Sequence, residues 1–361
     1  VFQIEIAANN RFYSYGFSID YLKREFQAEW LYDVTDDKEV CFFERDIEEG
    51  TTKTGLKFPA SSKDGMRYEV YKTDITASKL FLSEFAKKDI DETSIFWPLK
   101  VVYNWFLKVV VVYPYSHAMK PNNFFVNSSG NNTALAQMLA GFDTGIEGIS
   151  SEKKSLEEAL SFMPKEDRSQ LISIIENDIR EHEEIRMSMD EDAKKSISIG
   201  VNNQSFVISM ENGELMADQL MMNHGNKDDL FDLYDESDGT QRLFDLIPAY
   251  EVVKDGRVIL IDEVDRSFHS KLTEEFVRRY FEITEGSACQ MICTTHDLNL
   301  MTLNLLRKDE IWFAERDNEH STRLYSLSEF KTRNDKSVLN DYIQGRYGAI
   351  PCISEIESEE A

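Results

Sequence analysis

VILIDEVD, residues Val258–Asp265, is the strongest signal of fold in this chain. Four consecutive apolar residues are typical of a strand buried on both faces, as in a parallel sheet with helices on either side. Helix-like and strand-like segments alternate around it. In chain order they are helix Ser237–Tyr250, strand Val258–Ile261, helix Leu272–Glu282, strand Cys289–Thr294, helix Leu298–Leu306, strand Ile311–Ala314 and strand Leu324–Ser326. This alternation predicts an α/β domain with a parallel sheet covered on both faces.

Two carboxylates, Asp262 and Glu263, come directly after the central strand. The carboxyl ends of parallel strands form the edge at which open α/β sheets bind ligands. In ATPases that transfer a phosphoryl group, an aspartate in this position holds Mg²⁺, and the adjacent glutamate polarises the attacking water. For this pair alone, the alternative is an ordinary strand end without a chemical role.

A histidine follows the next apolar strand, in the string MICTTHD at Met291–Asp297. Neighbouring parallel strands would bring His296 close to Glu263, where an imidazole can hydrogen-bond a γ-phosphate or position a water molecule. The alternative is a surface or core histidine. Its place one strand–helix–strand unit after the carboxylates favours the functional interpretation.

A third motif, DESDGTQRL, precedes both strands at Asp235–Leu243. Ser237, Gly239 and Thr240 offer two hydroxyls and a free backbone at a helix N-terminus, which is a natural site for an anion. The alternative is an ordinary helix N-cap provided by Ser237 or Asp238.

The first part of the chain is predicted to be rich in β-structure. Alternating apolar residues on both sides of Asn9 and Asn10 predict a hairpin. Further predicted elements are strands at Glu29–Tyr32 and Val40–Glu44, a loop at Glu48–Met66, helices at Ser78–Lys88 and Leu99–Leu107, and a strand at Val109–Tyr113.

The middle of the chain is predicted to be mainly helical, from Thr133 to Met163 and from Leu171 to Lys195, with strands at Ile197–Ile199 and Ser205–Met210. The acidic segment Leu171–Lys195 carries an apolar stripe. It is either a solvated helix packed on the main body or an arm that contacts a partner.

Composition limits the class of protein. Of 361 residues, 42% are apolar, which suffices for a sizeable core. With 40 basic and 66 acidic residues, the net charge of −26 disfavours a broad nucleic-acid footprint but does not exclude a local basic groove. No apolar run approaches the ~18 residues of a membrane span. The four cysteines form no metal or disulfide pattern and no signal sequence is recognisable, so we predict a cytoplasmic protein without membrane contact.

In this order the motifs resemble the head of ABC-class ATPases, with a signature motif, a Walker B strand with its catalytic glutamate, a D-loop and a switch histidine. The strings ESDGTQRLFDLIP, LIDEVDRSFH, TTHDLNLM and YIQGRYGAIP are more narrowly similar to AAA15-type ATP-binding proteins. These are SMC- and OLD-like proteins of bacterial abortive-infection and other anti-phage systems. RFYSYGFSID resembles the β-subdomain of that family, so the resemblance covers nearly the whole chain and is strongest over residues 230–352.

The resemblance implies an α/β fold: an ABC-type (SMC-like) head with a mixed or parallel sheet, an N-terminal antiparallel β-subdomain and a helical insertion. The implied parts are a β-rich lobe at residues 1–115, an insertion with return strands at 116–229 and a catalytic lobe at 230–361. ABC-class heads hold ATP and Mg²⁺ between two protomers. The implied roles are Mg²⁺ binding by Asp262, general base catalysis by Glu263, γ-phosphate sensing by His296, and contact with nucleotide by Ser237, Asp238, Gly239, Thr240 and Asp265.

The chain departs from the family in one respect, because no G-x-x-x-x-G-K-[ST] string occurs. The nearest string, GTTKTGLKF at Gly50–Phe58, has Leu56 where the phosphate-binding lysine should stand and is predicted to be a flexible loop. We expect Val1 to begin mid-domain, with the Walker A loop upstream, unless this variant lacks the loop.

The implied function is an ATPase that senses infection and controls a separate nuclease or toxin effector through ATP-dependent formation of a homodimer or higher homo-oligomer. The rivals are an SMC- or OLD-like repair ATPase that acts on DNA and a non-hydrolysing scaffold without Walker A. The string GRYGAIP at Gly345–Pro351 also matches the family, and by default it is a structural C-terminal turn.

Overall fold

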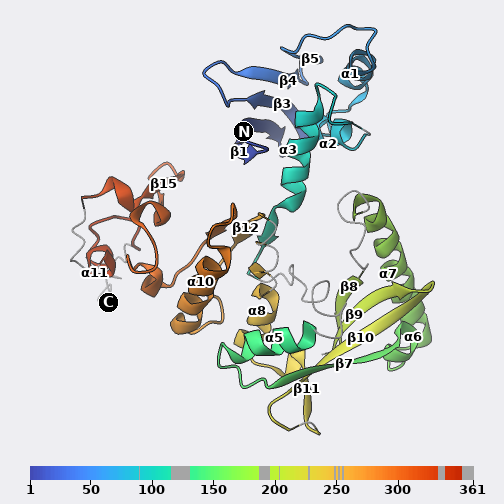
Figure 1. Cartoon of the computed structure of the whole chain (residues 1–361), viewed down its shortest axis with the longest axis vertical. Helices are drawn as coiled ribbons and strands as arrows, with labels where there is room; N and C mark the ends of the chain where they lie inside the picture. Colours follow the sequence, from blue (N-terminus) through green and yellow to red (C-terminus); the bar gives the residue numbers. More distant parts are fainter. Residues whose placement is uncertain are drawn as a thin grey trace, which may run out of the picture. The chain divides into compact units, whose positions relative to one another are not determined.

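The chain forms two compact units in a computed structural model, residues Val1–Val109 and Val110–Ala361 (Figure 1). The structure describes residues 1–88, 90–114, 131–186, 196–202, 204–226, 228–247, 249–250, 253, 256–331 and 338–351. Each unit has a hydrophobic core of its own. The three-part division expected from the sequence stays a prediction.

The first unit is built on an antiparallel five-stranded sheet of order β1-β2-β3-β4-β5. Its strands are β1 (Phe2–Ala8), β2 (Arg11–Asp20), β3 (Glu25–Asp33), β4 (Val40–Asp46) and β5 (Thr51–Lys53). Between β1 and β2 the chain turns at Asn9 and Asn10, with φ angles of 50° and 60°. Asparagine tolerates this left-handed conformation better than most residues, and the predicted hairpin is confirmed.

Three helices complete this unit: α1 (Lys63–Asp74), α2 (Phe81–Ala86) and α3 (Trp97–Lys108). Phe43 of β4 is buried with Phe81 and Phe85 of α2 and Leu99 of α3. The loop predicted at Glu48–Met66 was partly wrong, because this range contains β5 and the first residues of α1. The polar run conceals the start of α1, and the apolar residues of this helix come only later.

A buried carboxylate joins β3 to α2 in the first unit. The side chain of Glu29 accepts hydrogen bonds from the hydroxyl of Tyr15 at 3.0 Å and from the backbone amides of Phe81 and Leu82. Burial raises the pKa of Glu29 to about 7, because the apolar surroundings penalise its charged form more than these donors stabilise it.

The second unit contains a parallel three-stranded sheet of order β13-β12-β6. The strands are β6 (Val110–Val112), β12 (Val258–Ile261) and β13 (Gln290–Cys293), and β12 pairs in parallel with both neighbours. The predicted buried strand at Val258–Ile261 is confirmed with the same bounds. The chain therefore contains helices together with both a parallel sheet and an antiparallel N-terminal sheet, as expected for mixed α and β structure.

Helices cover one face of this sheet in the described part of the chain. Val112, Ile259 and Ile261 are buried in one cluster with α5 (Asn131–Ala140), α8 (Asp238–Leu246) and α10 (Ser270–Thr284). On the other face, Val111 is 40% exposed and Ile292 is 49% exposed. The prediction of a sheet covered on both faces is therefore not met among these residues, because the helices that flank β12 in sequence pack on the same side.

A second, antiparallel five-stranded sheet has the order β11-β10-β9-β8, with β7 also paired to β10. Its strands are β7 (Gly148–Ser155), β8 (Ser196–Val201), β9 (Gln204–Glu211), β10 (Glu214–Asn223) and β11 (Leu230–Asp232). Helices α6 (Leu156–Ala159) and α7 (Lys165–Arg186) pack against this sheet (Figure 1).

The strands expected at Ile197–Ile199 and Ser205–Met210 are confirmed as the β8–β9 pair. The continuous helical pattern predicted from Thr133 to Met163 was wrong, because β7 interrupts it. This strand is mostly polar and owes its conformation to eight backbone pairings with β10, which local patterning does not reveal. The end of the predicted segment Leu171–Lys195, residues 187–195, lies outside the described residues.

The last part of the chain folds around a two-stranded antiparallel sheet of β14 (Trp312–Arg316) and β15 (Thr322–Ser326). These strands pair with each other and do not extend the parallel sheet within the described residues. The helix predicted at Leu298–Leu306 is only a short 3₁₀ turn at Leu298–Leu300, since Met301 leaves helical geometry.

The GRYGAIP string after α11 (Val338–Ile343) forms a turn that packs against this small sheet. The hydroxyl of Tyr325 donates to the carbonyl of Tyr347 at 2.7 Å, and the amide of Ala349 donates to Glu315 at 3.2 Å. Gly348 has a φ of 72°, and an added Cβ there would lie 2.7 Å from the Tyr325 hydroxyl oxygen. These contacts explain why residues Gly345–Pro351 form a turn, which is a structural role.

Candidate functional site

The site begins where the parallel strands end. The amide of Asp262 donates to the carbonyl of Val112 at 2.8 Å, and the amide of Thr294 donates to the carbonyl of Ile261 at 3.0 Å. The carbonyl of Thr294 in turn accepts from the amide of Val264 at 3.0 Å. Backbone pairing thus continues past β12 on both sides, and it holds the Asp262-Glu263 pair at the carboxyl edge of the sheet.

Thr294 joins these two carboxylate residues. Its hydroxyl donates to Oδ1 of Asp262 at 2.5 Å and accepts from the amide of Glu263 at 2.8 Å. The backbone of Glu263 has a φ of 49°, a left-handed conformation that is uncommon for a residue with a side chain. One hydroxyl therefore orients the Asp262 carboxylate and stabilises the backbone conformation that directs Glu263.

The role of Thr294 was not predicted from the sequence. The two threonines after β13, Thr294 and Thr295, were the available signal. Their sequence did not reveal which hydroxyl would contact the residues after β12.

His296 lies on the chain that leaves β13. Its backbone amide donates to Oδ1 of Asp265 at 3.2 Å, and its side chain is exposed. Asp262 is also exposed, whereas Glu263 is half-buried. The structure thus places Asp262, Glu263, Asp265 and His296 on the ends of two adjacent strands, with Asp265 bonded directly to the backbone of His296.

The turn Ser237–Thr240 opens helix α8. Ser237 is the N-cap: its Oγ accepts from the amide of Thr240 at 3.2 Å and lies 2.9 Å from the Thr240 hydroxyl. Asp238 is the exposed first residue of the helix. The capping role that the sequence left open is therefore present, and a capping hydroxyl at a helix N-terminus still lies where an anion would bind.

Gly239 lies against the loop that follows β12. A Cβ added at Gly239 would lie 3.0 Å from the carbonyl oxygen of Ser267, two residues after Asp265. Such a distance is shorter than ordinary packing contacts, so glycine permits this close approach. The approach brings the Ser237–Thr240 turn and the Asp265 loop together.

Arg242 fixes α8 to the strand ends. This buried guanidinium donates from Nη1 to the carbonyl of Tyr113 at 3.4 Å and from Nη2 to the carbonyls of Asp262 at 3.3 Å and Glu263 at 3.4 Å. Burial lowers the pKa of Arg242, and the nearby Asp245 opposes that effect. Sequence reasoning missed this residue, although a basic side chain among the apolar residues of an amphipathic helix was a detectable signal.

The Asp262 carboxylate at the end of β12 fits a Mg²⁺ ion whose other ligands would be phosphate oxygens and water. Mg²⁺ is commonly held by one or two carboxylates together with substrate phosphates, and exposed Asp262 offers one oriented carboxylate. No group of three or more His, Cys, Asp or Glu side chains within the described ranges could hold a metal by itself. Of the four cysteines, Cys41, Cys289 and Cys293 are free, and Cys352 lies outside those ranges.

Comparison with known proteins gives one family. A family model described as "AAA domain, putative AbiEii toxin, Type IV TA system" matches residues 1–302. The matched range contains the strand-end residues and the Ser237–Thr240 turn. No curated protein matches the chain. Helices that the structure describes are all too short or too polar to cross a membrane.

Proposed function

Because the chain belongs to this AAA-domain family, we propose that it is an ATP-binding and ATP-hydrolysing subunit of a bacterial anti-phage, abortive-infection system. Family membership supports an ATPase of a defence or toxin system. The observation that carries the proposal further is the hydroxyl of Thr294, which orients Asp262 and supports the backbone of Glu263. The proposal includes the narrower assignment to ABC-class, AAA15-type heads.

In the proposed reaction, Asp262 would hold Mg²⁺, which would supply positive charge to neutralise the phosphates of ATP. Glu263 accepts a proton from the attacking water, a general-base step that typically contributes 10²–10⁴-fold to the rate. His296 contacts the γ-phosphate. Its backbone bond to Asp265 supports a direct link between the residue that senses nucleotide and the loop that would face a second subunit.

A second subunit completes the proposed site. Ser237, Asp238, Gly239 and Thr240 of one protomer would contact the γ-phosphate bound to the other, so ATP would favour a dimer or a higher homo-oligomer. The N-terminus of α8 supports this role, because its backbone amides and helix dipole attract negative charge.

The proposed dimer controls a separate effector protein, a nuclease or a toxin, in the cytoplasm. A net charge of −26 suits a basic protein partner better than nucleic acid, since phosphate binding requires clustered basic side chains.

Substitution of the proposed base tests the function. In the complete gene product, Glu263→Gln should lower ATP turnover by about 100-fold or more and accumulate an ATP-bound dimer, because an amide cannot accept the proton. Glu282→Gln, an exposed position on α10, is the matched control. Phosphate release and light scattering with ATP measure the two effects. Hydrolysis at the wild-type rate in Glu263→Gln would show that the base is assigned wrongly.

A non-hydrolysing scaffold is the second candidate, and one observation favours it: residues 1–361 contain no G-x-x-x-x-G-K-[ST] string. ATP binding measured on residues 1–361 and on the full product of the gene separates the two. Binding by neither would support the scaffold.

A further inference from the structure

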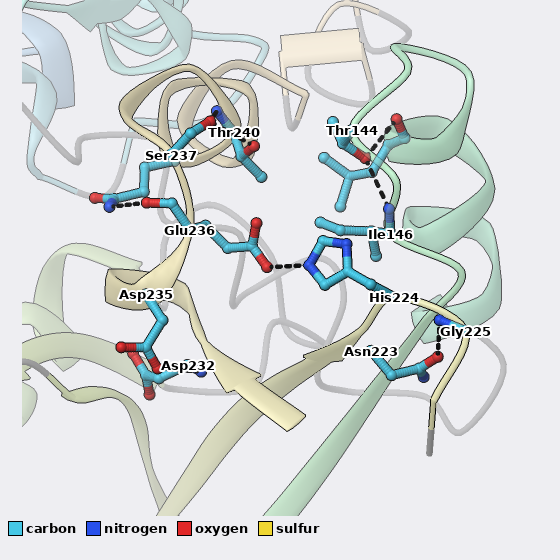
Figure 2. Close-up of polar contacts among 12 residues, drawn as sticks. Thr144, Ile146, Asn223, His224, Gly225, Asp232, Asp235, Glu236, Ser237 and Thr240 are labelled. Atoms are coloured by element: carbon cyan, nitrogen blue, oxygen red, sulfur yellow. Dashed lines mark hydrogen bonds and ion pairs between the residues drawn. The ribbon is translucent and has the colours of Figure 1, made fainter. Parts of the chain in front are cut away.

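A histidine of the antiparallel sheet contacts the residue just before the Ser237–Thr240 turn. Nε2 of His224, directly after β10, lies 2.8 Å from Oε1 of Glu236 (Figure 2). The Glu236 side chain is only 7% exposed, and that of His224 is 34% exposed. Since the carboxylate accepts, the imidazole donates through Nε2. This bond joins the hairpin of β10 and β11 to the start of α8.

The imidazole is held in place by its surroundings. The ring of Phe231 on β11 packs edge-on against it, with ring centroids 5.5 Å apart. On another side the chain passes closely at Gly145, where an added Cβ would lie 3.3 Å from Nδ1 of His224. Figure 2 shows the Thr144–Ile146 segment beside the imidazole. Contacts on two sides therefore restrict where the imidazole that holds Glu236 can lie.

The chain between β11 and Glu236 is bound to the same sheet. Gln219 of β10 donates to Asp232 at 3.0 Å, in the buried part of the hairpin. The hydroxyl of Tyr234 lies over β8, so closely that a Cβ added at Gly200 would be 1.9 Å from it. The chain is therefore tied to the sheet at Asp232 and Tyr234, and the bond from His224 extends this tie to Glu236, the last residue before the helix N-cap.

Local bonds within the turn do not set its place relative to the sheet. The bond between Ser237 and the amide of Thr240 closes the turn over three residues, and the side chain of Gln241 donates to the carbonyl of Glu236 at 2.9 Å. Both bonds would move together with α8. The bond between His224 and Glu236 differs, because it ties the Ser237–Thr240 turn and α8 to the β-sheet.

We propose that His224 is a positioning residue for the Ser237–Thr240 turn: by holding Glu236, it sets where Ser237 lies and couples the β7–β11 sheet to the turn. This inference rests on the proposed function for the turn's action on nucleotide. The coupling itself is a property of the folded chain, and it can be measured without ATP.

Hydrogen exchange in the complete, nucleotide-free protein tests the coupling. His224→Ala should speed exchange of the hydrogen-bonded amides of Glu236, Thr240 and Gln241 by about tenfold, because a hydrogen bond to a charged group contributes ~1.5 kcal/mol. His224→Gln should restore most of the protection, since its side-chain amide can donate to Glu236. His320→Gln, an exposed histidine in the turn between β14 and β15, is the matched control. Unchanged exchange in a folded His224→Ala protein would overturn the proposal.

ATP turnover tests the consequence for the reaction. His224→Ala should lower kcat by about tenfold and leave KM for ATP within about twofold, because the turn acts only when two subunits close on nucleotide. Faster exchange with unchanged kcat would overturn the positioning role. If the wild-type protein does not hydrolyse ATP, the proposed function fails, and the exchange experiment still decides whether His224 couples the sheet to the turn.

Discussion

Replacement of Thr294 by valine tests the strand-end site most directly. Valine has nearly the shape of threonine and suits the end of a strand, but it lacks the hydroxyl that donates to Asp262 and accepts from Glu263. The substitution therefore removes two hydrogen bonds at once and leaves the packing nearly unchanged.

The expected magnitude follows from the exposure of these groups. A hydrogen bond to a charged group contributes ~1.5–3 kcal/mol when it is shielded from water. Asp262 and Thr294 are both exposed, so water replaces part of the lost interaction. We expect Thr294→Val to raise the activation free energy of ATP hydrolysis by ~1–2 kcal/mol, which lowers kcat by roughly 5- to 30-fold. Because water reaches both groups, the free energy of unfolding should fall by less than ~1 kcal/mol.

The assay is steady-state phosphate release by the complete protein over a titration with Mg²⁺. Thr294→Val should need more Mg²⁺ for half-maximal activity, because its Asp262 carboxylate is no longer oriented. Thr294→Ser keeps the hydroxyl and should retain most of the activity, and urea unfolding of each variant controls for stability. Wild-type kcat and Mg²⁺ dependence in Thr294→Val would refute the assignment of a positioning role to this hydroxyl.

Two further predictions concern buried charges. The pKa of Glu29 is about 7 in the folded chain, above the ordinary value of 4.5, so the folded state binds more protons and loses up to ~3 kcal/mol of stability as the pH rises through this interval. Glu29→Gln should remove that loss, as measured by urea midpoints between pH 5 and 8; an unchanged slope with pH would contradict it. Arg242→Met should destabilise the protein by ~1–3 kcal/mol, because three carbonyl acceptors lose a donor. Thermal unfolding measures this, and full stability of Arg242→Met would show that the guanidinium does not anchor α8.

Elements with strong local signals were predicted well. Val258–Ile261 combines a short apolar run with flanking polar residues, and the Asn9-Asn10 pair suits a left-handed turn, so both were identified from a few neighbouring residues. Strand β7 was missed because its polar sequence carries no period and its conformation depends on pairing with β10. The helix expected at Leu298–Leu306 fails for the converse reason: apolar spacing suited a helix, but the chain leaves helical geometry at Met301.

The residues of the candidate site also differ in how far their positions could be predicted from neighbouring sequence. The positions of Asp262, Glu263 and His296 after two strands were predicted because strand ends can be recognised from sequence, and the structure has both strands. Their roles in the reaction stay predictions. The contacts of Thr294 and Arg242 were not predicted, since they depend on partners far away along the chain. The bond from Thr294 to Asp262 spans 32 residues, and the bond from Arg242 to Tyr113 spans 129.

The order of the chemical groups and the central strand followed from the sequence, because periodicity acts over a few residues. The sequence also limited the N-cap of α8 to Ser237 or Asp238, and the structure identified Ser237. Three contacts depend on the tertiary fold: Thr294 with Asp262, Arg242 with the carbonyls at the strand ends, and His224 with Glu236. Burial of apolar surface is non-directional, so it brings segments together without specifying which polar atoms meet. Those atoms find their partners at hydrogen-bond distance only after the strand register and the helix positions have been established.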